Sequence, residues 1–146
     1  MSVFVDAGVF YAHHDRDAPR HEAALGAFER LTSGEFGTIY TSDYIYDETV
    51  TLTLARTGSY TDAKAVGDRI LGRGGFPDMV TVLHVSKSQF LAAVDTFETY
   101  HDQALSFTDA TTVVLAEREN IDAVLSFDDD FDGVVDRLDP AALAEQ

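Results

Sequence analysis

Four acidic side chains of this protein stand at positions where carboxylates could act together on a metal ion. Asp6 and Asp128 each follow directly after a short apolar run. Asp109 falls in the first turn of a predicted helix, and Glu48 lies beside the apolar face of another. Clustered carboxylates repel one another unless cations neutralise them, and oxygen ligands in a chain without cysteine suit Mg²⁺ or Mn²⁺. Such an ion can activate water against a phosphodiester bond.

Taken singly, each of these acids has an ordinary structural explanation. Asp6 and Asp128 could cap the segments that follow them, because Asp is a favoured N-cap residue. Asp109 could interact with the positive N-terminal end of its helix dipole. Glu48 could be one of the many glutamates that lie at the boundary between the core and solvent. The metal-site hypothesis therefore depends on whether the fold brings the four acids to one place.

The segments that would position these acids alternate between β-rich runs and helical patterns, which is typical of βα units around a parallel sheet. We predict strands at residues 3–5, 38–41, 79–85 and 123–127, with a last strand or helix near 134–143. We therefore expect an α/β fold, with a single domain over residues 1–146 and a central parallel sheet of four to five strands. In open sheets of this kind, sites lie beyond the carboxyl ends of the strands, where Asp6 and Asp128 stand.

Capping residues indicate where the helices begin and end. Ser42 and Ser86 are predicted N-caps, and Gly58 is a predicted helix end. Thr108 is the predicted N-cap of the helix whose first turn holds Asp109.

Four short motifs, in chain order, resemble the PIN-domain nucleases, in particular the VapC-type toxin ribonucleases. The resemblance spans nearly the whole chain and follows the predicted βα pattern. In the fourth motif, Ser126 stands where threonine is more usual. The motifs are Val3-Phe4-Val5-Asp6-Ala7-Gly8-Val9-Phe10, the 41–54 segment with Glu48, Leu105-Ser106-Phe107-Thr108-Asp109-Ala110, and Ser126-Phe127-Asp128-Asp129-Asp130-Phe131.

The resemblance implies a PIN-like α/β/α sandwich and a Mg²⁺- or Mn²⁺-dependent endoribonuclease. By this resemblance Asp6, Asp109 and Asp128 would hold the metal, and Glu48 would complete the catalytic set. Ser126 would support Asp128 by hydrogen bonding, and two further residues would assist the site, namely Thr108 and Asp130. Relatives of this kind act on RNA, and many are homodimeric toxins that a small antitoxin holds silent.

A calcium-binding loop is an alternative interpretation of the last acidic segment. Asp128-x-Asp130-x-Asp132-Gly133 matches the start of an EF-hand loop. The twelfth position is Asp139 instead of glutamate, and the preceding segment is β-rich instead of helical. An interaction module that keeps the fold without activity, using residues 128–139, is a further alternative.

Basic and histidine residues offer weaker signals. His13, His14 and His21 are interpreted as a solvated helix end and not as a metal site, because adjacent residues point to different helix faces. Candidates for phosphate contact are the arginines at four positions, although ordinary surface ion pairs are the favoured interpretation: Arg16, Arg20, Arg56 and Arg73.

The composition is strongly acidic, with 10 Lys and Arg against 26 Asp and Glu and a net charge of −16. Such a surface repels nucleic acid at low salt, but it also resembles that of proteins from organisms with a salt-filled cytoplasm. The absence of cysteine excludes disulfides and cysteine-ligated zinc. No apolar run reaches membrane-spanning length and the N-terminus lacks a charged leader, so we expect a cytoplasmic protein.

Overall fold

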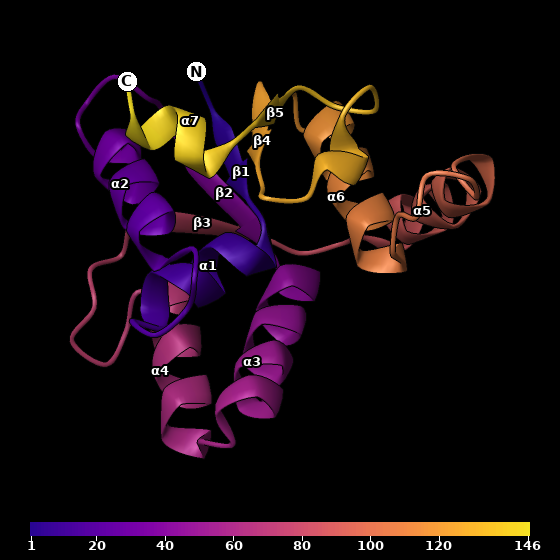
Figure 1. Cartoon of the computed structure of the whole chain (residues 1–146). Helices are drawn as coiled ribbons and strands as arrows, with labels where there is room; N and C mark the ends of the chain where they lie inside the picture. The colour runs from indigo at the N-terminus through magenta and orange to yellow at the C-terminus, as the bar shows by residue number, and fades with distance from the viewer.

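The computed structural model describes residues 1–146 and contains a five-stranded sheet in which every pair of neighbouring strands is parallel (Figure 1). The strand order is β3-β2-β1-β4-β5. The expected α/β/α architecture with a parallel sheet is confirmed. The strands are β1 (Val3–Val5), β2 (Ile39–Ser42), β3 (Val80–Leu83), β4 (Ala123–Leu125) and β5 (Arg137–Leu138).

Helices cover both faces of this sheet. The chain first adds strands outward from β1 through β2 to β3, and then crosses back past β1 to β4. Because connections between parallel strands are right-handed, α5 and α6 lie on the opposite face of the sheet from the other helices. Figure 1 shows α7 against α2, and α3 paired with α4 in a projection away from the sheet. The helices are α1 (Ala7–His14), α2 (His21–Leu31), α3 (Asp43–Thr57), α4 (Tyr60–Leu71), α5 (Lys87–Thr99), α6 (Phe107–Arg118), α7 (Pro140–Ala144) and the 3₁₀ helix η1 (Asp129–Phe131).

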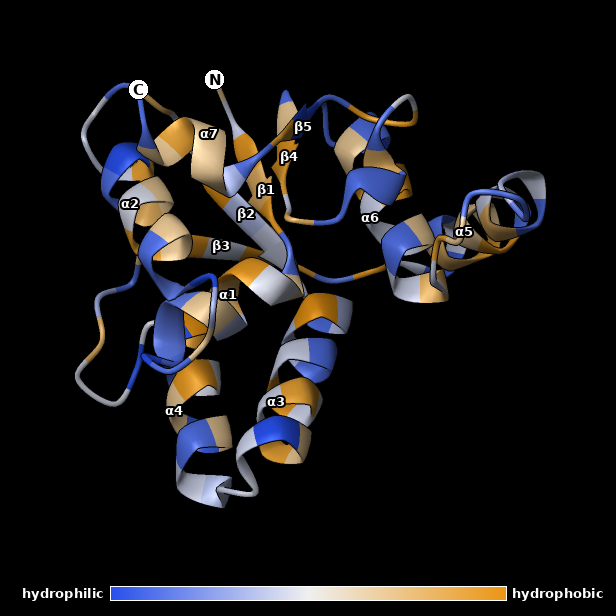
Figure 2. Ribbon diagram, in the orientation of Figure 1, coloured by the Kyte–Doolittle hydropathy of each residue, from blue (hydrophilic) through white to orange (hydrophobic).

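The centre of the sheet is apolar on both faces. β1 and β4 consist entirely of buried apolar residues, and Figure 2 shows them among the most hydrophobic segments of the chain. Strands covered on both faces need such continuous apolar runs. The two strands pair over their full length, with Val5 opposite Leu125, so that both end at the same edge of the sheet.

Three of the four predicted caps are confirmed. The Ser42 hydroxyl accepts a hydrogen bond from the Ile45 amide at the start of α3, and Ser86 forms a capping box on α5. Gly58 ends α3 with a left-handed backbone (φ 64°), a conformation that glycine adopts without steric cost.

The fourth predicted cap, Thr108, is wrong. The N-cap of α6 is Ser106, two residues earlier, because Ser106 and Asp109 form a reciprocal capping box. The Ser106 hydroxyl accepts from the Asp109 amide, and the Asp109 carboxylate accepts from the Ser106 amide. This pairing satisfies two otherwise free amides at once, which a cap at Thr108 would not do.

The histidines of α1 and α2 do not form a solvated helix end. The His13 ring lies 4.4 Å from the ring of Phe28, and His14 Nε2 is 3.1 Å from an Asp62 carboxylate oxygen. The ring of His21 is hydrogen-bonded to the carbonyl of residue 12. Burial lowers the pKa of His13 to about 4. These rings therefore tie α1 to α2 and α4.

None of the helices is both long enough and apolar enough to cross a lipid bilayer.

Candidate active site

The site lies where the direction of strand order reverses, at the carboxyl ends of β1 and β4. These strands are neighbours in space although about 120 residues separate them in the chain. Asp6 directly follows β1, and Ser126 directly follows β4. Loops diverge from such a point and leave a crevice, which is where ligands bind in open parallel sheets.

Asp6 is almost fully buried, and both of its carboxylate oxygens are occupied. One oxygen accepts from the Ala7 amide and so caps α1, while the other accepts a 2.6 Å hydrogen bond from the Ser126 hydroxyl. Burial raises the pKa of Asp6, and the nearby Asp128 raises it further, whereas these two hydrogen bonds lower it. Asp6 therefore caps α1 and also lies in the site.

Ser126 forms hydrogen bonds to Asp128, as predicted, and also to Asp6. Its hydroxyl donates to Asp6 and accepts from the backbone amide of Asp128. The structure therefore contains the predicted hydrogen bond between Ser126 and Asp128, and it is made to the backbone amide of Asp128. Ser126 thus links the Asp6 carboxylate to the backbone that carries Asp128, because its short side chain points across to β1.

Asp109 reaches the same place from the first turn of α6. It is 7% exposed, and the capping box with Ser106 fixes its orientation. Burial raises the pKa of Asp109 to about 6, with further contributions from Asp6 and Asp128. One carboxylate oxygen serves the cap, so the other is available to a ligand.

Glu48 approaches from α3 and has no protein partner for one of its oxygens. Glu48 Oε2 is buried and accepts no hydrogen bond, which is costly for a polar atom. Burial raises the pKa of Glu48 to about 7, and Asp6 and Asp109 are the next largest causes. A shift caused by neighbouring acids indicates that these carboxylates are close enough to repel one another.

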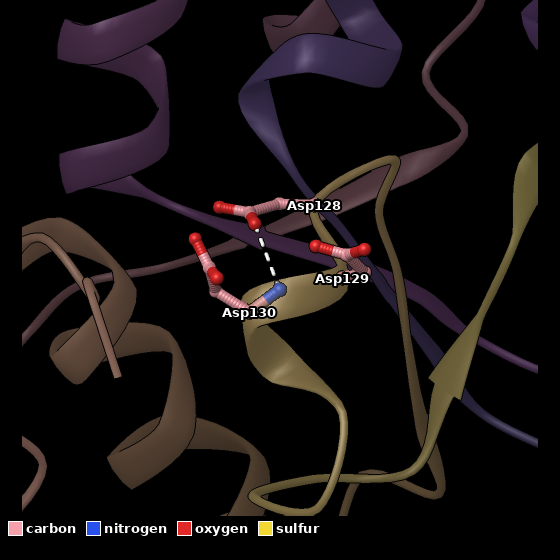
Figure 3. A group of neighbouring side chains, drawn as sticks. All are labelled: Asp128, Asp129 and Asp130. Carbon is pink, nitrogen blue, oxygen red and sulfur yellow. Dashed lines mark hydrogen bonds between the residues drawn. The ribbon is translucent and has the colours of Figure 1, made fainter. Parts of the chain in front are cut away.

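All four predicted acids line one hollow of 620 Å³. They come from four separate elements, and no lysine borders them. Asp128 enters after β4 and caps η1 by accepting from the Asp130 amide at 2.9 Å (Figure 3). Asp129 also lines the hollow, whereas Asp130 and Thr108 do not.

Asp129 is the acidic residue that the sequence interpretation missed. The side chains of Asp128, Asp129 and Asp130 each offer an oxygen, and these oxygens lie within 4.8 Å of one another (Figure 3). The sequence interpretation chose Asp128 and Asp130 from this run of three acids, whereas Asp128 and Asp129 line the hollow. The 3₁₀ turn decides which of them faces it.

The EF-hand loop is not assembled. The carboxylate of Asp132, its third predicted ligand, is paired with the Arg137 guanidinium at 2.7 Å. Asp139, its twelfth position, caps α7 by accepting from the amide of residue 141. Between them lies strand β5, so the segment does not curl around a common centre.

A family model for the PIN domain matches residues 3–136 of this chain. The chain belongs to the PIN domain family. The family resemblance of the four sequence motifs is thereby confirmed. This PIN domain is 21% identical over 132 residues to a VapC ribonuclease of Archaeoglobus fulgidus, a match that covers 90% of this chain and 80% of the relative.

Three solved structures with a similar fold can be compared with this chain. VapC20 of Mycobacterium tuberculosis, a sarcin-ricin loop cleaving toxin, is 26% identical, with a TM-score of 0.74 over 88% of this chain and 92% of its own. VapBC2 from Rickettsia felis, bound to a DNA fragment from its promoter, has a TM-score of 0.68 at 11% identity, covering 94% of this chain and 98% of its own. FitAcB from Neisseria gonorrhoeae has a TM-score of 0.64 at 15% identity, covering 94% and 97%. The latter two show the shared PIN fold.

Proposed function

We propose that this protein is a Mg²⁺- or Mn²⁺-dependent endoribonuclease and the toxin of a toxin–antitoxin pair. The observation that carries the proposal is the convergence of Asp6, Glu48, Asp109 and Asp128 on one hollow at the switch point of the sheet. The similarity to a VapC ribonuclease and to a toxin that cleaves RNA supports RNA as the substrate.

The donor set fits a hard divalent cation. The hollow offers carboxylate oxygens and no cysteine or histidine, and oxygen ligands suit Mg²⁺ or Mn²⁺. The buried Oε2 of Glu48 lacks a partner, and a cation or its water would supply one. Asp6, Asp109 and Asp128 would hold the ion, and Glu48 would complete the set. When bound, the ion supplies an activated water and offsets charge on the leaving oxygen.

The residues around these carboxylates keep them oriented. The Ser126 hydroxyl holds Asp6, and the Ser106 amide holds Asp109, so neither side chain must be ordered when a ligand arrives. Glu48 keeps a proton up to near neutral pH in the metal-free protein, because its pKa is about 7. Cation binding and proton binding therefore compete at Glu48, and metal uptake releases protons.

The partners are proposed from the same resemblance. We expect a small antitoxin that covers the hollow, a homodimeric toxin, and a cytoplasmic location. The large negative charge favours an antitoxin whose contacting segment is basic, because opposite charges steer association.

The decisive experiment is incubation of the purified protein with a panel of structured and single-stranded RNAs. The panel is run with EDTA and with Mn²⁺, at low and at molar KCl. Endonucleolytic products that require the metal and vanish in Asp109→Asn support the proposal. Products that persist in EDTA or in Asp109→Asn would point to a contaminating nuclease, and a lack of cleavage in every condition would refute the proposal.

A further inference from the structure

The acidic hollow does not end at its carboxylates. A second hollow of 490 Å³ adjoins it, and the two share a common wall. The adjoining hollow is half apolar, unlike the acidic one. The shared lining residues are Gly8, Arg20, Leu52, Arg56 and Phe127.

Two arginines on this wall are positioned by aromatic rings. The guanidinium of Arg20 lies 4.8 Å from the centre of the Phe127 ring, and that of Arg56 lies 4.8 Å from the centre of the Tyr11 ring. The Tyr11 ring is itself held by a 2.6 Å hydrogen bond from its hydroxyl to Asp15. A ring contacts the flat face of a guanidinium, so the N–H donors at its edge stay available.

Neither of these guanidiniums forms an ion pair. This is notable in a chain with 26 Asp and Glu against 10 Lys and Arg. By contrast, Arg73, another arginine considered from the sequence, is paired with Asp68 at 3.0 Å. Both Arg20 and Arg56 are exposed, and both border the hollow that holds the carboxylates.

The spacing along α3 separates these arginines from the acids. Glu48, Leu52 and Arg56 follow at intervals of four residues, so they lie on one face of the helix. At a rise of about 1.5 Å per residue, Arg56 stands about 12 Å along the axis from Glu48. α3 runs away from the sheet, so this face extends the site beyond the carboxylates (Figure 1).

We propose that Arg20 and Arg56 bind a phosphate of the nucleotide adjacent to the cleaved bond, and that Leu52 and Phe127 accept its base. This inference rests on the proposed ribonuclease function. A guanidinium matches phosphate oxygens with two parallel donors, and bases pack on aromatic side chains. The two positive charges also offset the repulsion that the carboxylates of the hollow exert on an incoming RNA strand.

The test compares Arg20→Gln, Arg56→Gln and the double variant with the double control Lys87→Gln/Arg118→Gln. The control removes the same charge at the start of α5 and at the far end of α6, away from the hollow. Each single variant should raise KM for RNA about tenfold, because a charged hydrogen bond is lost, with kcat changed less than about threefold. The control should change neither.

Equilibrium binding separates this inference from the proposed function. The same arginine changes are placed in an Asp109→Asn background, and binding of a fluorescent single-stranded RNA is followed against KCl. The slope of log affinity against log salt should increase by about 0.7 for each arginine removed. An unchanged plot in the double variant, or no RNA binding by the parent, overturns the inference.

Three further outcomes are distinguishable. If the parent binds RNA through these arginines but active protein cuts no RNA, the inference stands and the proposed function fails. If RNA is cut and the double variant matches the control, the function stands and the inference fails. If the arginines bind poly-glutamate but not RNA, the wall is a protein-docking surface and the inference fails.

Discussion

The Ser126 hydroxyl donates a 2.6 Å hydrogen bond to the Asp6 carboxylate. The bond connects the carboxyl ends of β1 and β4, where the strand order of the sheet reverses. Both residues are buried, and the bond joins positions 120 residues apart. Hydrogen bonds to ionised groups are among the stronger ones in proteins. This contact therefore couples the closing of β4 against β1 to the orientation of a candidate metal ligand.

Ser126→Ala should weaken metal binding more than it weakens the fold. Losing the hydroxyl raises the pKa of Asp6 further, because this hydrogen bond lowers it. We expect Mn²⁺ affinity to fall about 10- to 100-fold, as for other residues that orient metal ligands. Unfolding free energy should fall by about 1–2 kcal/mol. Titration calorimetry and urea unfolding measure the two effects.

Ser126→Thr is the matched control, because threonine keeps the hydroxyl. Its Mn²⁺ affinity should stay within about threefold of the parent value, although the added methyl group costs some stability. Equal losses of metal affinity in the alanine and threonine variants would show that the hydroxyl does not position Asp6.

Asp6→Asn should reduce RNA cleavage at least about 100-fold. Mutation of a residue that only orients a metal ligand already lowers metal affinity or activity by up to about 100-fold. The fold should remain, because asparagine keeps the size of the side chain and one acceptor oxygen. Asp132→Asn is the control, since its carboxylate is paired with Arg137 outside the hollow. Cleavage rates and circular dichroism provide the measurements.

Calorimetric titration of the same two variants tests the calcium-loop interpretation independently. Asp6→Asn should lose the Mn²⁺ signal, and Asp132→Asn should keep it. Ca²⁺ binding that disappears in Asp132→Asn but survives in Asp6→Asn would place the cation on the 128–139 segment instead.

Without metal, the contribution of Glu48 and Asp109 to the stability of the fold should fall as pH rises from about 4 to 7. The pKa of Glu48 is raised from 4.5 to about 7, and that of Asp109 from 3.8 to about 6. A raised pKa means that the folded state favours the protonated acid. The resulting stabilisation is complete below the unfolded pKa and is lost as pH rises through the folded pKa.

Glu48→Gln should flatten this pH dependence, because glutamine stays neutral throughout. Urea unfolding in EDTA at pH 5 and pH 8 measures the difference, with Glu98→Gln on the exposed face of α5 as the control. Mn²⁺ should restore stability at pH 8 in the parent. The prediction is contradicted if the loss of unfolding free energy between pH 5 and pH 8 in EDTA is no larger in the parent than in Glu48→Gln.

RNA cleavage should rise between low and molar KCl. The net charge of −16 opposes RNA at low salt, and the Debye length falls from about 10 Å at 0.1 M to about 3 Å at 1 M. Short-range contacts survive this screening better than the long-range repulsion does. Folding should follow the same trend, because repulsion among the acids weakens.

Activity against KCl, with circular dichroism recorded in parallel, measures both parts of this prediction. A steady loss of activity from 0.1 M upward in a protein that remains folded would show that the acidity is not an adaptation to salt.

Local features of the fold could be predicted from the chain because they depend on neighbours in sequence. The apolar runs before Asp6 and Asp128 predict β1 and β4, and Ser42 and Gly58 predict both ends of α3. The cap of α6 was misplaced, since Ser106 and Thr108 are both good caps and only the side-chain geometry of Asp109 selects between them.

By itself, the sequence determined the βα order and four of the five acids that line the hollow, because strand ends and helix starts are set by local pattern. Only the tertiary structure decided which strands are neighbours, and hence that Ser126 holds Asp6. It also decided that Asp129 faces the hollow, and that Arg20 and Arg56 border it without an acidic partner. These relationships depend on contacts between segments far apart in the chain, and on the direction in which each side chain leaves its turn. Neither is encoded in the spacing of residue types along one segment.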